Sequence, residues 1–242
     1  MAGVGFALIL IPDNDVDSYF EARIRRPSYS GRNRPVVLID EAHGNSYTIE
    51  GRFLPLARLL RQDGYIAGPN LRRITKDSLR GIAVLIIGNP KAVSAKETAA
   101  LREWISEGGS LLLAIDSGPA AAFGIEMAAG NAGSDVQLLR REAGQIASHA
   151  ITDGRKRVEQ VERVMTFGGQ GFHAPASASP LLLAPNGAMG FALEVGKGRI
   201  AVLGNAAMIT AQRTRNTAIG FNRGGNDNVR LVLNLLHWLS RL

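Results

Sequence analysis

The sequence contains no cysteine, and it has few histidines and aromatic residues. Its 242 residues include four histidines and 6% aromatic side chains. Without cysteine there can be no disulfide, no thiolate metal site and no cysteine nucleophile. The histidines show no metal-ligand spacing, so we expect neither a metal nor another cofactor. Because the aromatics are sparse and not interleaved with arginines, the pattern argues against a stacking surface for single-stranded nucleic acid.

The apolar content is sufficient for a full core. Hydrophobic residues make up 45% of the chain and charged residues 20%, as in folded globular proteins. A single α/β domain is the default at this length. The formal net charge of +7 at pH 7 attracts anions but does not identify which anion. Much of this charge lies in one basic stretch and in scattered arginines.

The first 34 residues differ from the rest of the chain. Residues 2–12 (AGVGFALILIP) are apolar, but as a helix they would rise only about 16 Å, against a hydrocarbon core of about 30 Å. They also lack the basic region and cleavage site of a signal peptide. Asp13 to Arg34 is polar and basic and is typical of a linker. We therefore expect one folded domain over residues 35–242, preceded by an apolar segment and a basic linker.

The location of the protein depends on how the apolar segment is interpreted. If the reading frame extends upstream of Met1, residues 2–12 are the remnant of a membrane anchor or signal segment, and the domain is extracytoplasmic or tethered to a membrane. Otherwise the segment is a short element packed on the body or a disordered tail, and the protein is cytoplasmic.

Strands and helices alternate in the first half of the domain. Three continuous apolar runs predict strands buried on both faces, at residues 35–40, 82–90 and 110–116. Helical spacing predicts helices at residues 53–62 and, after a capping box formed by Ser94 and Glu97, as far as Gly108. A short strand at residues 65–67 and an alanine-rich helix from Pro119 to about Ala129 complete this half.

The second half has strand-like runs without long helices between them. These runs are VMTF, PLLLAP, GFALEVG and RIAVLG, and a closing helix begins at Asn226 or Asp227. His237 falls on the core-facing side of that helix and is interpreted as a structural histidine. The whole pattern predicts an α/β domain with a mainly parallel central sheet, covered on both faces, and additional β-strands in the C-terminal half.

Polar residues follow the predicted strands, at the edge of the sheet where open α/β proteins bind ligands. The candidate ligand-binding residues are Asp40, Glu41, His43, Asn45, Asn89, Asp116, Ser117 and Asn205. Carboxylates beside a histidine can bind a polyol, a cation or an amine, or can perform acid–base chemistry. The alternative is that each residue caps a loop or helix. Gly196-Lys197 lacks the other residues of a phosphate loop, and Ser117 lacks the glycines of a hydrolase elbow.

The strand ends resemble the class I glutamine amidotransferases. IIGNP (86–90) is similar to the segment that helps form the oxyanion hole of that family, and LLLAIDSG (111–118) is similar to the strand and elbow that carry its cysteine. In this register Asp116 occupies the position of the nucleophile, and Asn205 and Ala206 stand where the family has a late histidine and glutamate. A carboxylate without a base cannot replace the cysteine. The resemblance therefore implies the fold and argues against amidotransferase activity.

A closer resemblance is to uncharacterised bacterial domains grouped with the amidotransferase-like domains of gliding-motility and intraflagellar-transport proteins. The matching segments are IDEAHGN (39–45), FLPLARLLRQDGY (53–65), VLIIGNP (84–90), LREWISEGGSLLLAID (101–116), GKGRIAVLGNAAMITAQ (196–212) and NDNVRLVLNLLHWL (226–239). The resemblance implies a three-layer, flavodoxin-like or amidotransferase-like α/β sandwich, often exported or tethered to a membrane. It implies no particular reaction, and sugar or polyol binding is the suggestion attached to the group. Asp40, Glu41, His43 and Asn45 are the residues that would carry that binding.

The leading prediction is a domain that binds a small polar ligand or a partner protein at the strand ends, with membrane transport or secretion components as possible partners. A hydrolase that uses Asp40, Glu41, His43 and Asp116 is the alternative. A nucleic-acid binder comes third, since only the net charge of +7 favours it.

Overall fold

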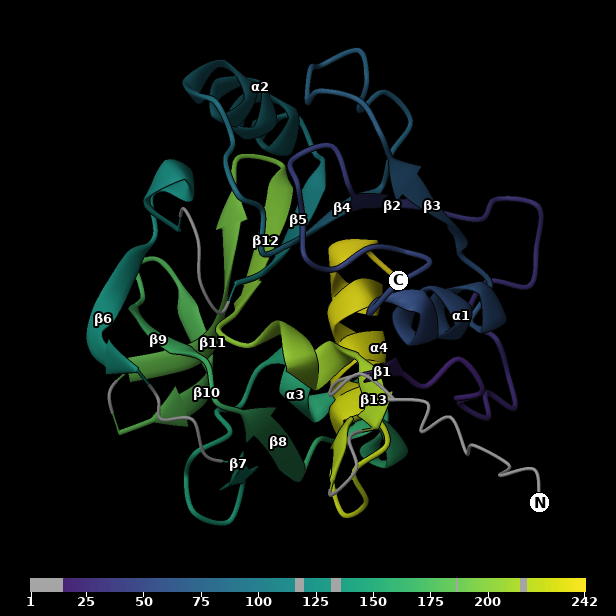
Figure 1. Ribbon diagram of the computed structural model, residues 1–242, viewed down its shortest axis with the longest axis vertical. Coiled ribbons are helices and arrows are strands. Elements are labelled where there is room, and N and C mark those ends of the chain that lie inside the picture. The colour runs from purple at the N-terminus through teal and green to yellow at the C-terminus, as the bar shows by residue number, and fades with distance from the viewer. Residues whose placement is uncertain (1–14, 116–119, 132–135, 186, 214–216) are drawn as a thin grey trace, which may run out of the picture.

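The computed structural model describes residues 15–115, 120–131, 136–185, 187–213 and 217–242 (Figure 1). In this part of the chain the main sheet has nine strands, of which eight lie in the order β3-β2-β4-β5-β12-β11-β9-β6 and the ninth, β10, pairs with β11. The strands are β2 (Val36–Asp40), β3 (Ile66–Asn70), β4 (Val84–Gly88), β5 (Ser110–Ala114), β6 (Glu126–Asn131), β9 (Gln170–His173), β10 (Ser179–Ala184), β11 (Gly187–Val195) and β12 (Gly198–Leu203).

The sheet is parallel in one half and antiparallel in the other. β3, β2, β4, β5 and β12 run parallel to one another, whereas β11 runs antiparallel to β12, β9 and β10, and β6 antiparallel to β9. The predicted α/β sandwich with a mainly parallel centre and additional strands in the C-terminal half is therefore confirmed. The parallel half brings the carboxyl ends of β2, β3 and β4 to one edge.

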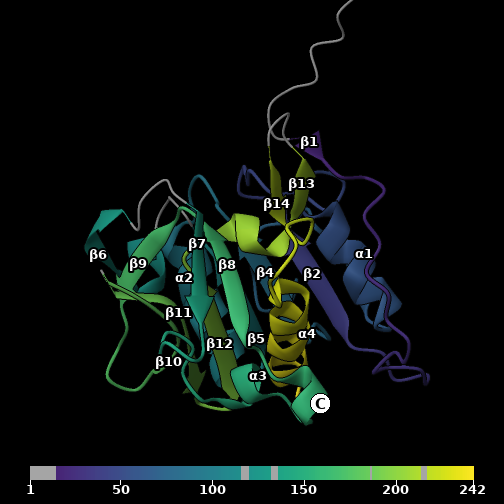
Figure 2. The ribbon, with the colours of Figure 1, turned by 90° about the horizontal axis from the view of Figure 1, so that it is seen from below.

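Helices cover both faces of the sheet. On one face, α1 (Leu54–Gln62), α3 (Ala150–Asp153), α4 (Asn228–Leu239) and the pair β7 (Val136–Arg140) and β8 (Arg163–Phe167) surround a core that includes Val84 and Ile86. On the other face, α2 (Ala95–Ser106) packs over Leu85 and Ile87. Neighbouring residues of β4 thus point into different cores, which is why its sequence is apolar throughout. Figure 2 shows α3, α4, β7 and β8 in front of the central strands, with α2 behind them.

The described part of the basic N-terminal segment lies against the body of the protein. β1 (Asp15–Val16) pairs with β13 (Ala211–Arg213), which pairs with β14 (Ala218–Gly220). Residues 17–34, here called the N-terminal strap, pack the partly buried side chains of Phe20, Ala22, Ile24 and Tyr29 against the core to which α1 and α4 also contribute. The Arg34 side chain donates to the carbonyls of Gly64 and Tyr65. The domain boundary at residue 35 stays a prediction.

The alanine-rich stretch does not form the predicted helix. Residues Ala120–Phe123 form a 3-10 turn, η1, and the chain then extends as β6, where Glu126 lies opposite His173 of β9. Pairing with β9 overrides the helix propensity of the alanines. The remaining short turns are η2 (Arg157–Glu159) and η3 (Ala206–Ile209). Within the described residues, no helix has the length and apolar character needed to cross a membrane.

Candidate functional site

His43 joins two acidic side chains at the carboxyl edge of the sheet. Asp40 is the last residue of β2, and Glu97 lies in the first turn of α2. The Nδ1 atom of His43 is 2.8 Å from Oδ2 of Asp40, and its Nε2 atom is 3.0 Å from Oε1 of Glu97. The exposed fractions of the Asp40, His43 and Glu97 side chains are 0%, 6% and 12%. We call these three residues the histidine–carboxylate cluster.

Further donors surround both carboxylates of the cluster. Nδ2 of Asn70, at the end of β3, donates to Oδ1 of Asp40 at 2.9 Å. The amide of Ile74 donates to Oε1 of Glu97 at 3.2 Å, and the Ser94 hydroxyl donates to Oε2 at 2.5 Å. Ser94 and Glu97 form the predicted capping box. Glu97 therefore has two roles, of which the sequence pattern revealed only the cap.

The cluster favours a charged imidazole. The hydrogen bond to Asp40 raises the pKa of His43 to about 9, reinforced by the hydrogen bond to Glu97 and opposed by burial. Burial raises the pKa of Glu97, but hydrogen bonds from Ser94 and His43 outweigh it and lower the pKa to about 2. At neutral pH both ring nitrogens of His43 thus carry protons and donate to carboxylates. An imidazolium in this position has no lone pair for accepting a proton or binding a metal.

Glu41 and Asn45, also predicted site residues, shape the loop that holds His43. Oε1 of Glu41 accepts a hydrogen bond from the amide of Ile49 at 2.6 Å. Oδ1 of Asn45 accepts from the amide of His43 at 3.1 Å, and its Nδ2 donates to the carbonyl of Gly88 at 3.2 Å. These contacts fasten the loop to the end of β4.

Of the other predicted residues, two contact the backbone of β5 or β8 and two fall outside the described residues. Asn89 has a φ of 41°, and its amide donates to the carbonyl of Ala114 at 3.1 Å. Asn205 is buried, and its side-chain amide exchanges two hydrogen bonds, of 3.3 and 3.2 Å, with the backbone of Phe167 at the end of β8. Asp116 and Ser117 fall outside the described residues.

A cavity of about 360 Å³ opens beside Glu97. One wall is the segment from Arg73 to Asp77, and the other is the start of α2, where Ser94 and Lys96 lie. Lys76 extends from this wall to α2, with Nζ 3.0 Å from Glu103 and 2.6 Å from Glu107. Among the described residues, no group of three or more histidines and carboxylates could hold a metal ion.

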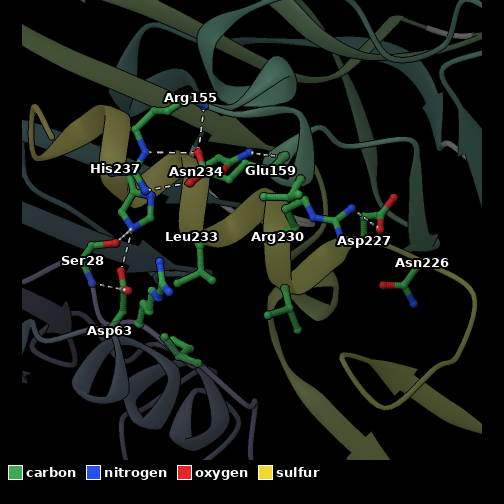
Figure 3. A pocket seen from close by; sticks show the side chains of 14 residues that line it. Ser28, Asp63, Arg155, Glu159, Asn226, Asp227, Arg230, Leu233, Asn234 and His237 are labelled. Carbon is green, nitrogen blue, oxygen red and sulfur yellow. Dashed lines mark hydrogen bonds and ion pairs between the residues drawn. The ribbon is translucent and has the colours of Figure 1, made fainter.

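A second cavity, of about 350 Å³, lies between the N-terminal strap and α4 (Figure 3). Ser28 of the strap, Asp63 at the end of α1 and His237 of α4 meet in its wall. The sequence pattern predicted His237 in the core and did not single out Ser28 or Asp63. The two partners of His237 lie 209 and 174 residues away in sequence, beyond the reach of any spacing rule.

No protein-family model and no curated protein sequence matches the chain significantly. The structure resembles the mmIFT52 N-terminal domain, with a TM-score of 0.63 at 14% identity over 85% of this chain and 97% of that one. It also resembles a putative ThuA-like protein from Bacteroides uniformis, with a TM-score of 0.54 at 11% identity over 91% of this chain and 95% of that one. A third similar structure is a protein described as a putative GMP synthase subunit from Thermoplasma acidophilum. Its TM-score is 0.55 at 11% identity, over 87% of this chain and 96% of that one. The chain therefore has the amidotransferase-like fold expected from its sequence.

Proposed function

We propose that this protein is a non-catalytic amidotransferase-like domain that binds a small polar ligand, of the sugar or polyol class, at the carboxyl edge of the sheet. The observation that carries the proposal is the state of His43, whose two nitrogens donate to the buried carboxylate of Asp40 and the partly buried carboxylate of Glu97. The one histidine among the predicted site residues is thereby committed to holding the loop after β2 against α2.

The groups that could serve as nucleophile or general base at this site are either absent or already engaged in hydrogen bonds, which supports a non-catalytic domain. The chain has no cysteine to serve as nucleophile. A general base needs a pKa near the working pH, and the pKa of His43 is raised to about 9 by its carboxylate partners. Asp40 and Glu97 each accept hydrogen bonds from several donors, so neither is left available for attack on a substrate.

The cavity beside Glu97 supports a small polar ligand. Its volume of about 360 Å³ is at the lower end of the range for small-molecule pockets. Its walls combine the hydroxyls of Thr75 and Ser94, the cations of Arg73 and Lys96, and the carboxylate of Asp77. A ligand rich in hydroxyls can both donate to and accept from such a mixed wall. The sequence pattern predicted a ligand at the strand ends, and this cavity adjoins that place through Glu97.

The experiment is a titration of the full chain with a panel of monosaccharides and polyols, followed by thermal shift and by NMR chemical-shift changes. Thr75→Val and Lys96→Ala should abolish the response, because they alter the cavity wall and leave the cluster intact. Glu142→Gln is the control, because Glu142 is an exposed residue that does not line the cavity. This variant should respond like the parent protein.

A response that survives both cavity variants would overturn the assignment of the site. The same samples test the hydrolase alternative. Turnover in an esterase, glycosidase and phosphatase screen that is lost in His43→Ala would show that the domain is an enzyme and would contradict the proposal.

A further inference from the structure

A third cavity, of about 100 Å³, lies between α2 and the sheet, on the face opposite α1 and α4. Its floor is formed by apolar side chains of three adjacent strands, with Leu111 and Leu113 from β5, Val202 from β12 and Phe191 from β11. All four side chains are buried and belong to the same core as α2. The cavity shares no described lining residue with the one beside Glu97.

The position of this cavity follows from the uneven cover of the sheet. In the described part of the chain, α2 is the only α-helix that contributes to the core on this face. Leu193 of β11 and Ile200 of β12 remain partly exposed beside it. The turn from η1 to β6 supplies two further wall residues, Phe123 and Ile125. The cavity is thus the space left between α2, this turn and the strands.

A single charged group belongs to the cavity wall. Among the described wall residues, Arg102 of α2 is the only one with an ionisable side chain. Its Nη2 atom lies 3.9 Å from the position that a Cβ would take at Gly124, so the guanidinium is placed beside another wall residue. Both residues are exposed, whereas the floor is buried. The cavity therefore has an apolar floor and a cationic mouth.

The charge at the mouth is not balanced by a neighbour. Arg102 makes no hydrogen bond or ion pair with another described residue. A guanidinium keeps its charge throughout the pH range in which proteins are folded. It also presents its N–H groups as a planar fork, which matches the two oxygens of a carboxylate. The mouth therefore favours a carboxylate over a neutral or cationic group.

The floor determines what the carboxylate is attached to. Cavities lined by leucine, isoleucine and phenylalanine stay dry and take up apolar molecules, because water finds no hydrogen-bond partner in them. An apolar cavity of about 150 Å³ holds a benzene molecule, so about 100 Å³ has room for about two thirds as many carbon atoms, or about four. A short hydrocarbon chain fits this space, and a long acyl chain does not.

We propose that this cavity binds a short-chain carboxylate, whose chain of about four carbon atoms lies on the leucines of β5 and whose carboxylate pairs with Arg102 at the mouth. The proposal does not depend on the sugar or polyol site, because the two cavities share no described residue and can be altered separately.

The test is a titration of the full chain with straight-chain carboxylates from acetate to octanoate, at constant ionic strength. Binding is followed by the methyl NMR signals of Leu111, Leu113 and Val202. Affinity should rise about fourfold with each added methylene as far as pentanoate, the gain expected for burying one methylene, and should then level off. 1-Pentanol and pentylamine, which have the same number of carbon atoms, should bind more weakly than pentanoate.

One variant tests the floor. Leu193→Phe extends a side chain of the wall into the cavity and should weaken pentanoate binding about tenfold, which corresponds to the loss of about two buried methylenes. Val195→Phe is the matched control, because Val195 lies on the same strand and packs against the same core but does not line the cavity. This variant should bind pentanoate like the parent protein.

A second variant tests the mouth. Arg102→Gln should weaken pentanoate binding about threefold, the effect expected for one exposed ion pair, and should leave the binding of 1-pentanol unchanged. Arg157→Gln removes the same charge from an exposed position outside the cavity wall and should change neither. Arg102 is exposed, so this variant keeps the test decisive even where Leu193→Phe does not fold.

Three results would overturn the proposal. The first is that no carboxylate of the series shifts the methyl signals, in which case the cavity is a gap in packing. The second is that Leu193→Phe, folded as judged by its unfolding transition, binds pentanoate as tightly as the parent. The third is that Arg102→Gln prefers pentanoate over 1-pentanol by the same factor as the parent, since the mouth would then not select a carboxylate.

Discussion

Oε1 of Glu97 accepts two hydrogen bonds, one from Nε2 of His43 at 3.0 Å and one from the amide of Ile74 at 3.2 Å. One carboxylate oxygen thus joins the loop after β2, the segment after β3 and the first turn of α2. These three pieces form the edge of the sheet where a ligand is proposed, so the histidine–carboxylate cluster sets the shape of that edge.

Removal of the imidazolium should destabilise the fold. In His43→Ala the carboxylates of Asp40 and Glu97 lose their shared cation, and breaking a buried ion pair costs about 3 kcal/mol or more. Urea unfolding monitored by fluorescence measures the loss. His173→Ala, at an exposed position in β9, is the control and should change the stability little. An equal effect of the two variants would mean that the cluster adds nothing to stability.

Stability should depend on pH at both ends of the range. The pKa of His43 is raised from 6.5 to about 9, so its contribution is complete below pH 6.5 and is lost as the pH rises through 9. The pKa of Glu97 is lowered from 4.5 to about 2, so its contribution is complete above pH 4.5 and is lost as the pH falls through 2. Urea titrations across pH 3 to 10 check this, and the alkaline slope should flatten in His43→Gln.

Asn205 should prove structural. Its buried side-chain amide holds the backbone of Phe167, and loss of both hydrogen bonds in Asn205→Ala should cost about 1–3 kcal/mol. The response to sugars and polyols should be unchanged in the folded fraction. If Asn205→Ala loses the response to sugars and polyols but keeps its stability, Asn205 contacts the ligand, as the sequence predicted.

Gly64 should be required for docking of the strap. A Cβ at Gly64 would collide with the carbonyl oxygen of Tyr29, at 2.0 Å. Gly64→Ala should therefore displace the strap and accelerate trypsin cleavage after Arg23 or Arg25. Gly81→Ala is the matched control, because Gly81 also has a positive φ, of 77°, but has no atom within 4 Å of its Cβ position. In both variants an alanine at positive φ destabilises the backbone by about 1 kcal/mol. The difference between their cleavage rates therefore reports the collision with Tyr29 alone. Equal cleavage rates would contradict a docked strap.

Local signals in the sequence predicted most of the parallel half of the fold. The apolar runs at residues 36–40, 84–88 and 110–114 are strands, and Ser94 begins a helix as its capping box predicts. These features depend on burial and on contacts a few residues apart. The helix predicted from Pro119 to about Ala129 is wrong for the described residues of that stretch, because pairing of β6 with β9, far along the chain, decides their conformation.

The candidate sites were less predictable for the same reason. The position of Asp40 at a strand end and its proximity to His43 follow from the sequence, since the two are three residues apart. Nothing in the sequence indicated that Glu97, 54 residues beyond His43, would hold the other ring nitrogen. The meeting of Ser28, Asp63 and His237 depends on how the strap, α1 and α4 pack together.

The place of β12 in the sheet has a consequence for synthesis of the chain. β5 pairs with β4 on one side and with β12 on the other, although β12 follows only after β6 to β11. Until residues 198–203 leave the ribosome, the nascent sheet ends at β5, whose five residues are all buried in the finished protein. An apolar strand with an unpaired edge is a template for association with other chains. Nascent chains from which residues 198–203 have not yet emerged are therefore the ones that most need a chaperone.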